Sequence, residues 1–146
     1  METRELLEGE LDDLLTLYSQ MHASDDPLPE RREVEAVWRQ IRDSRSFRYL
    51  GVFVDGRLVS SCTLSIIPNL SRGCRPYGVI ENVVTHAAHR RKGYGTAVLK
   101  EALALARESR CYKVMLCTGR KSEEIGTFYE SAGFDGRSKR AFLARP

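Results

Sequence analysis

Apolar residues recur every three or four positions in four stretches of the chain, which predicts four amphipathic helices. We expect them over Glu10–Met21, over Glu30–Asp43, over Thr96–Ser109, and between an N-cap at Ser122 and a stop at Gly133. The first two are separated by Ala23–Pro29, where the prolines predict a loop. Because such an apolar stripe usually covers a sheet, we expect Trp38 to be a core residue rather than a ligand-stacking one.

Between these helices lie β-prone runs that predict strands. The expected strands are Phe47–Val54, Leu58–Ile67, Val79–Thr85, Tyr112–Cys117 and, at the end of the chain, Arg140–Leu143, with a short extended segment before the first helix. Asp55-Gly56 can adopt the positive φ angles of a tight turn, so the first two strands should form an antiparallel hairpin. The helix between the third and fourth predicts a parallel β-α-β unit. Pro68–Pro76 is expected to be a loop, and the whole chain a mixed α/β sandwich.

Composition narrows the class of protein. A chain of 146 residues with 42% hydrophobic residues predicts one domain, residues 1–146. A net charge of +3 does not indicate a nucleic-acid partner, and no apolar run is long enough to cross a bilayer. The four cysteines contain no C-x-x-C pair and no zinc-binding spacing with histidine, so we expect a reduced, cytoplasmic protein without a metal.

A basic, glycine-containing turn follows the third expected strand and leads into a helix. Its sequence is Arg90-Arg91-Lys92-Gly93-Tyr94-Gly95-Thr96. The glycines allow a close backbone approach, and the unpaired N–H groups of the helix start, with the adjacent cations, suit a pyrophosphate. The spacing is neither that of a Walker loop nor that of a dinucleotide-binding motif. An ordinary basic turn and a small nucleic-acid patch are the alternative interpretations.

Two motifs together resemble the GNAT superfamily of acyl-CoA-dependent N-acyltransferases. Arg90-x-x-Gly93-x-Gly95 is similar to its phosphate loop, and Phe128–Phe134 (Phe-Tyr-Glu-Ser-Ala-Gly-Phe) is similar to its F-Y-x-x-x-G-F segment. They stand in the family's order, with a helix and a strand between them. The resemblance implies an α+β fold with a mostly antiparallel central sheet, helices on both faces and a parallel β-α-β core. It is specific for the C-terminal half, and the N-terminal half matches in element order alone.

The resemblance also implies acetyl-CoA as the co-substrate. Its pantetheine would pair with the backbone of Val83–Thr85, where the strands Val79–Thr85 and Tyr112–Cys117 would splay apart. Its pyrophosphate would lie on Arg91–Thr96. The residues expected to bind it are Val83, Val84, Thr85, Arg90, Arg91, Lys92, Gly93, Tyr94, Gly95, Thr96 and Ser122.

The expected reaction is the attack of a primary amine on the thioester. Tyr129 matches the family tyrosine that protonates the leaving thiolate, although it also lies on the apolar stripe of its helix. Glu81 is the candidate for accepting the amine's proton, with an ion pair or an exposed edge position as the alternative. A backbone N–H near Val84 would polarise the thioester carbonyl, a role that the resemblance suggests.

Two positions depart from the family pattern. Ile80-Glu81-Asn82-Val83-Val84 resembles the I-E-D-V-V strand of glucosamine-6-phosphate N-acetyltransferases, but Asn82 replaces the aspartate. Ser122 stands where many members have an asparagine that contacts the cofactor. The sequence therefore predicts an N-acetyltransferase whose amine acceptor (a small metabolite, an amino sugar or a protein amine) and homodimer formation stay open. The alternative is an acyl-CoA-binding module without turnover.

Overall fold

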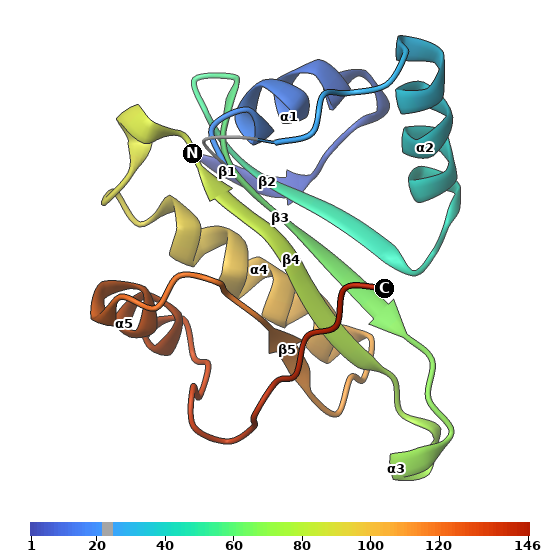
Figure 1. Ribbon diagram of the computed structural model, residues 1–146, viewed down its shortest axis with the longest axis vertical. Helices are drawn as coiled ribbons and strands as arrows, with labels where there is room; N and C mark the ends of the chain where they lie inside the picture. Colours follow the sequence, from blue (N-terminus) through green and yellow to red (C-terminus); the bar gives the residue numbers. More distant parts are fainter. Residues whose placement is uncertain (22–24) are drawn as a thin grey trace.

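The computed structural model describes residues 1–21 and 25–146, and a five-stranded sheet lies at its centre (Figure 1). The order across the sheet follows the chain: β1 (Glu2–Glu5), β2 (Phe47–Val54), β3 (Arg57–Ile67), β4 (Tyr77–Thr85) and β5 (Val114–Leu116). Neighbouring strands are antiparallel except β4 and β5, which are parallel. The predicted fold class is confirmed, including the hairpin, whose turn residues Asp55 and Gly56 have φ angles of 49° and 75°.

Helices cover both faces of the sheet. They are α1 (Leu11–Tyr18), α2 (Arg31–Asp43), α4 (Tyr94–Glu108) and α5 (Glu123–Ser131), with the short turns η1 (Glu8–Glu10), α3 (Ser71–Cys74) and η2 (Ala87–His89). Helix α4 connects the parallel strands β4 and β5 and buries Val98, Leu99, Ala102 and Ala106 against one face of the sheet. Helix α1 buries Leu11, Leu14 and Leu17 against the other face. Among the described residues, no helix has both the length and the apolarity needed to span a bilayer.

Trp38 belongs to the core under α1, as the sequence predicts. Its side chain is 6% exposed, and its ring meets Tyr49 edge-on with 5.3 Å between ring centroids. Its indole N–H donates to the carbonyl oxygen of Glu8 at 3.0 Å, so the polar atom of the ring is satisfied inside the core. Trp38 therefore fixes α2 to the sheet rather than presenting a surface to a ligand.

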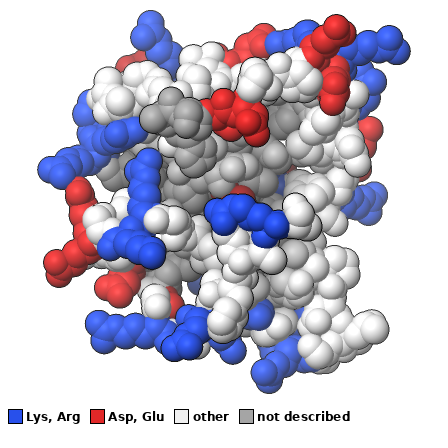
Figure 2. Space-filling model, in the orientation of Figure 1, with Lys and Arg blue, Asp and Glu red and all other residues white. Residues whose placement is uncertain are grey.

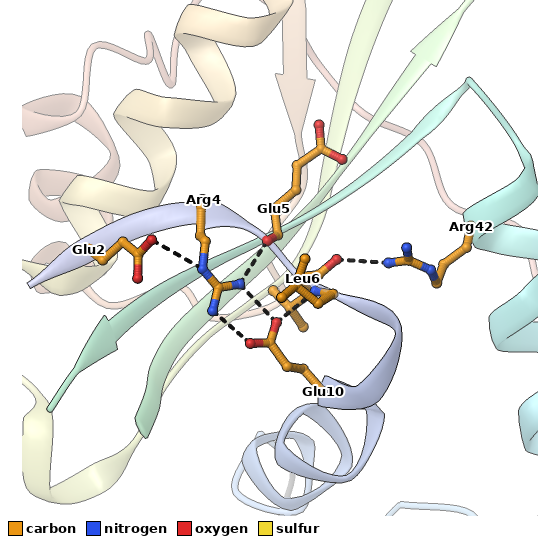
Figure 3. Close-up of polar contacts among 7 residues, drawn as sticks. Glu2, Arg4, Glu5, Leu6, Glu10 and Arg42 are labelled. Atoms are coloured by element: carbon orange, nitrogen blue, oxygen red, sulfur yellow. Dashed lines mark hydrogen bonds and ion pairs between the residues drawn. The ribbon is translucent and has the colours of Figure 1, made fainter. Parts of the chain in front are cut away.

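A polar cluster ties the N-terminal strand to the turn before α1 (Figure 3). Both terminal nitrogens of Arg4 donate to the Glu10 carboxylate, at 2.9 and 2.6 Å, and the Leu7 N–H donates to the same carboxylate at 2.6 Å. Arg42 of α2 donates to the Leu6 carbonyl oxygen at 2.9 Å. The hydrogen bonds from Arg4 hold the pKa of Glu10 below its usual value.

The structure corrects several predicted elements. The closing strand Arg140–Leu143 is wrong: this segment has no regular structure, and Phe142 and Leu143 are 89% and 79% exposed. The edge strand β5 has only three residues, which leaves little ladder for a further strand to pair with. Helix α1 ends at Tyr18 rather than Met21, and α4 begins at Tyr94 rather than Thr96.

Two other predictions need adjustment. Ser122 is the N-cap of α5, but its side chain makes no capping hydrogen bond, and its carbonyl oxygen accepts from the Ile125 N–H instead. Pro68–Pro76 is not wholly a loop, because it contains the short turn α3. Part of the predicted loop Ala23–Pro29 lies outside the described residues, and residues 25–29 are irregular as expected.

Candidate active site

Strand β4 contains a bulge at the point where it leaves β5. Opposite β3, Glu81 pairs with Thr63 and Val84 pairs with Ser61, so β4 has one residue more than β3 over this interval. Asn82, inside the interval, has a φ angle of 54°. Asparagine tolerates this left-handed conformation better than most residues, and an extra residue of this kind bends the strand that carries it.

The pairing of β4 with β5 stops just before this bulge. The parallel register covers only Gly78, Val79 and Ile80, which face Val114, Met115 and Leu116. From Glu81 to Thr85, β4 pairs with β3 on one side and with no described strand on the other. The bulge therefore divides β4 into a part built into the sheet and a part with one free edge.

The basic turn after β4 has an irregular backbone that ends at the start of α4. Arg91 and Gly93 have φ angles of 60° and 83°, and α4 begins at the next residue, Tyr94. The first hydrogen bond into the helix runs from the Ala97 N–H to the Gly93 carbonyl oxygen at 2.9 Å. The N–H groups of Tyr94, Gly95 and Thr96 precede that bond and lie at the positive end of a 15-residue helix, which favours an anion.

The cations of this turn make contacts within the site. Arg90 donates from Nε to the Thr85 carbonyl oxygen at 3.2 Å, and Lys92 donates to the Ala88 carbonyl oxygen at 3.2 Å. Arg91 forms an ion pair of 2.7 Å with Glu124 in the first turn of α5. Figure 2 shows Lys and Arg side chains at the left margin, over the segment between β4 and α4. The turn is thus a cationic surface held against both β4 and α5.

Gly95 allows the start of α4 to approach both β4 and α5. A Cβ atom at this position would lie 3.1 Å from two ring atoms of Phe128 and 3.3 Å from the hydroxyl oxygen of Thr85. These separations are tight for carbon, so a larger residue would have to displace its neighbours. The glycine motif, the end of β4 and the Phe128 segment of α5 therefore meet at one point.

Tyr129 lies on α5 beside two phenylalanine rings. The ring centroids of Phe128 and Phe134 are 4.8 and 6.3 Å from its own. Burial raises the pKa of the Tyr129 hydroxyl above its usual value, while the Arg120 charge and the Thr118 hydroxyl offset part of that rise. The hydroxyl therefore keeps its proton at neutral pH. Tyr129 packs against the core and carries a protonated hydroxyl, so the core position and the role of proton donor are compatible interpretations of its place in the sequence.

Glu81 and Ser122 are placed differently from Tyr129. Glu81 is exposed, and its negative charge contributes to the raised pKa of Tyr129, so the two side chains lie within electrostatic range of each other. Ser122 stands two residues before Glu124, the partner of Arg91, and is exposed. The structure brings the two candidate catalytic residues into one region and leaves Ser122 at its edge.

Sequence reasoning missed a group of hydroxyls beside Glu81. Thr63, the cross-strand neighbour of Glu81, is 5% exposed, and its hydroxyl oxygen has no hydrogen-bond partner among the described residues. The Tyr18 hydroxyl is also buried, and its burial raises its pKa, while the nearby Thr63 and Asn82 side chains offset part of that rise. Tyr18 lies on the apolar stripe of α1, so its spacing in the sequence predicts a core residue and does not predict its position near β4.

In the described ranges, 1–21 and 25–146, no three metal-ligating side chains gather at one point. The candidate site is therefore built from a strand edge, a helix start, a phenol and a carboxylate. These groups can bind an extended ligand with an anionic end and can move protons.

Comparisons with known proteins agree with this arrangement. The model of the acetyltransferase (GNAT) family matches residues 11–134. A protein of Trypanosoma brucei brucei named glucosamine 6-phosphate N-acetyltransferase is 38% identical over 88 residues, which are 60% of this chain and 58% of that protein. The chain spans about half the length of the curated relatives it matches, between 46% and 58%.

Solved structures with similar folds cover the chain more fully. A protein of Agrobacterium tumefaciens str. C58 named "Putative acetyltransferase" has a TM-score of 0.93 and 39% identity, with 100% of both chains covered. A Trypanosoma brucei acetyltransferase has a TM-score of 0.82 and 29% identity, with 99% of both chains covered. The structural similarity therefore includes the N-terminal half of the chain, which contains neither of the two sequence motifs.

Proposed function

The chain belongs to the GNAT family of acetyltransferases, and we propose that it transfers an acetyl group from acetyl-CoA to a primary amine. One observation carries this proposal. The strand β4 loses its β5 partner after Ile80, and its free edge leads directly into the basic turn and the start of α4. An extended ligand with a pyrophosphate at one end fits this sequence of groups.

The residues present suit acetyl-CoA in the following way. The backbone of Val83–Thr85 offers strand-type hydrogen bonds to the pantetheine, and the first N–H groups of α4 bind the pyrophosphate. Arg90, Arg91 and Lys92 add positive charge near those N–H groups. Gly93 has a positive φ directly before α4 begins, and Gly95 in the first turn of α4 lies against Thr85 at the end of this edge. Ser122 contributes at most a peripheral contact, because it lies at the exposed N-cap of α5.

The catalytic roles are assigned from the place of Glu81 on β4 and from the raised pKa of the Tyr129 hydroxyl. The amine must attack as the neutral base, and Glu81 accepts its proton directly or through water. The Tyr129 hydroxyl, kept protonated by burial, donates its proton to the departing thiolate. The backbone N–H near Val84 stabilises the negative charge that develops on the thioester carbonyl oxygen when the amine attacks the carbonyl carbon.

The names of the relatives suggest a class of amine acceptor without identifying the molecule. Several of them are named glucosamine 6-phosphate N-acetyltransferases, which makes amino sugars the first class to test. Asn82 stands where the I-E-D-V-V pattern that this strand resembles has an aspartate, which argues for a different contact with the acceptor. We therefore propose an amino sugar or a related small amine, with no requirement for a phosphate.

The test measures release of free CoA thiol from acetyl-CoA with a panel of amines: glucosamine, glucosamine 6-phosphate, an aminoglycoside and a peptide with a free N-terminus. We expect at least one amine to release thiol and to yield an equal amount of acetylated product. Calorimetric binding of acetyl-CoA without thiol release from any amine would instead identify a binding module. Absence of acetyl-CoA binding would contradict both functions.

A further inference from the structure

Ser60 is a fully buried polar residue that no catalytic or binding role yet explains. It lies on β3, is 0% exposed, and is paired across the sheet with Thr85, the last residue of β4. Its hydroxyl donates to the Val84 carbonyl oxygen at 3.0 Å and lies 2.8 Å from the hydroxyl oxygen of Thr85. A buried hydroxyl with two contacts of this length is costly to remove, because its partners lose their hydrogen bonds with it.

The direction of these hydrogen bonds follows from counting protons. A serine hydroxyl has one hydrogen, and here it points to the Val84 carbonyl oxygen. The Thr85 hydroxyl must then be the donor in the contact between the two side chains. Ser60 therefore fixes the backbone of Val84 and the side-chain rotamer of Thr85 at the same time.

Thr85 transmits this constraint to the phosphate-binding turn. Its hydroxyl oxygen lies 3.3 Å from the position that a Gly95 Cβ would take, so it packs directly on the first turn of α4. Its carbonyl oxygen accepts the 3.2 Å hydrogen bond from Arg90. Both ends of the turn, Arg90 and Gly95, thus contact Thr85, and Thr85 in turn is hydrogen-bonded to Ser60.

The contacts that Ser60 makes are important because β4 no longer pairs with β5 at this point. Beyond Ile80 no described strand pairs with the β5 side of β4, so β3 is the one described strand that pairs with the residues leading into the turn. We propose that Ser60 is a positioning residue for acyl-CoA: it sets the place of the β4 edge and of the α4 start through Thr85. The proposal rests on the function proposed above.

The neighbouring residue provides a matched control. Ser61 is also 0% exposed and also lies on β3, but its hydroxyl has no hydrogen-bond partner among the described residues. Adjacent strand residues point to opposite faces, so Ser61 does not share the contacts of Ser60. Ser60→Ala and Ser61→Ala both remove a fully buried hydroxyl oxygen. Only Ser60→Ala also removes hydrogen bonds to other residues.

The experiment measures the Kd of CoA by calorimetry, and the KM of acetyl-CoA and kcat by thiol release, for the wild type and both variants. The loss of one net hydrogen bond corresponds to about a fivefold change, so we expect Ser60→Ala to raise Kd and KM about fivefold. Its kcat at saturating acetyl-CoA should stay unchanged. Ser61→Ala should bind CoA as the wild type does.

Thr85→Val removes the other end of the same contact and serves if Ser60→Ala does not fold. It should raise the Kd of CoA by a similar factor, and the double variant should bind no more weakly than the weaker single variant. Equal effects of Ser60→Ala and Ser61→Ala, or additive effects of Ser60→Ala and Thr85→Val, would overturn the inference. A wild type that does not bind CoA would instead overturn the proposed function.

Discussion

Substitution of Gly93 tests whether the fold imposes the backbone conformation of the proposed phosphate-binding turn. It has a φ angle of 83°, and a Cβ placed on it would meet no atom within 4 Å. Gly93→Ala therefore adds no clash, and its whole cost is that of a left-handed conformation for a residue with a Cβ. That cost is about 1–2 kcal/mol, which should appear as a lower free energy of unfolding.

Gly126 provides the same substitution with the opposite expected sign. It lies inside α5, its backbone is helical, and a Cβ placed on it would also meet nothing within 4 Å. Alanine in a helix interior is more stable than glycine by up to about 1 kcal/mol. Gly126→Ala should therefore stabilise the protein, although the chemical change is identical.

The assay is urea unfolding followed by circular dichroism, with calorimetry of CoA binding on the same samples. The two variants should differ by about 2 kcal/mol in the free energy of unfolding, with similar dependence on urea concentration. Gly93→Ala should also weaken CoA binding, and Gly126→Ala should not. Equal stability of the two variants would show that the positive φ at Gly93 is not enforced, and the argument for a preformed anion site would fail.

Three further predictions test other parts of the structure. Tyr129→Phe should lower kcat by about 10²–10⁴-fold with little change in the Kd of CoA. The control Tyr112→Phe, which removes a hydroxyl near the opposite end of β5, should leave kcat unchanged. Unchanged turnover in Tyr129→Phe would show that Tyr129 is not the proton donor. Glu10 has a lowered pKa in the folded state, so its contribution to stability is complete above its unfolded value of 4.5 and is lost as pH falls through the folded value. Urea unfolding of Glu10→Gln between pH 6 and 3 should accordingly show a shallower loss of stability than the wild type, and identical slopes would contradict this account. Asn82→Ala should cost about 1 kcal/mol in urea unfolding and Asn82→Gly less, because only the alanine is strained at positive φ, and the reverse order would refute the bulge argument.

The helices and the hairpin could be predicted because local patterns determine them. The apolar spacing of α2 and α4, and the Asp55-Gly56 turn, need no knowledge of the rest of the chain. The segment Arg140–Leu143 shows the limit of this reasoning. Its residues favour a strand, but a strand forms only with a neighbour, and β5 is too short to provide one.

The candidate site was predictable where a residue type fulfils a backbone requirement. Gly93 and Gly95 stand where the chain needs a positive φ and a close approach, and the sequence therefore reveals them. Ser60 and Thr63 carry no such signal. They lie in an apolar strand, and only the register of β3 against β4 places them beside Thr85 and Glu81. Serine and threonine are common in strands of every function, so their contacts had to come from the structure.

Asn82 is noticeable in the sequence, but its backbone role is seen only in the structure. From the sequence, its substitution for an aspartate was a departure that concerned only the acceptor. In the structure, it is a bulge residue with a φ angle of 54°, at the point where β4 leaves β5 and its free edge begins. Asparagine is among the few residues that adopt this conformation at low cost, so the position has a backbone requirement that is separate from any contact with the amine. The replacement therefore removes a charge beside Glu81 while it preserves the bend that exposes the β4 edge. If the proposed function is correct, we therefore expect Asn82→Asp to change the preference among amines and to leave CoA binding unchanged.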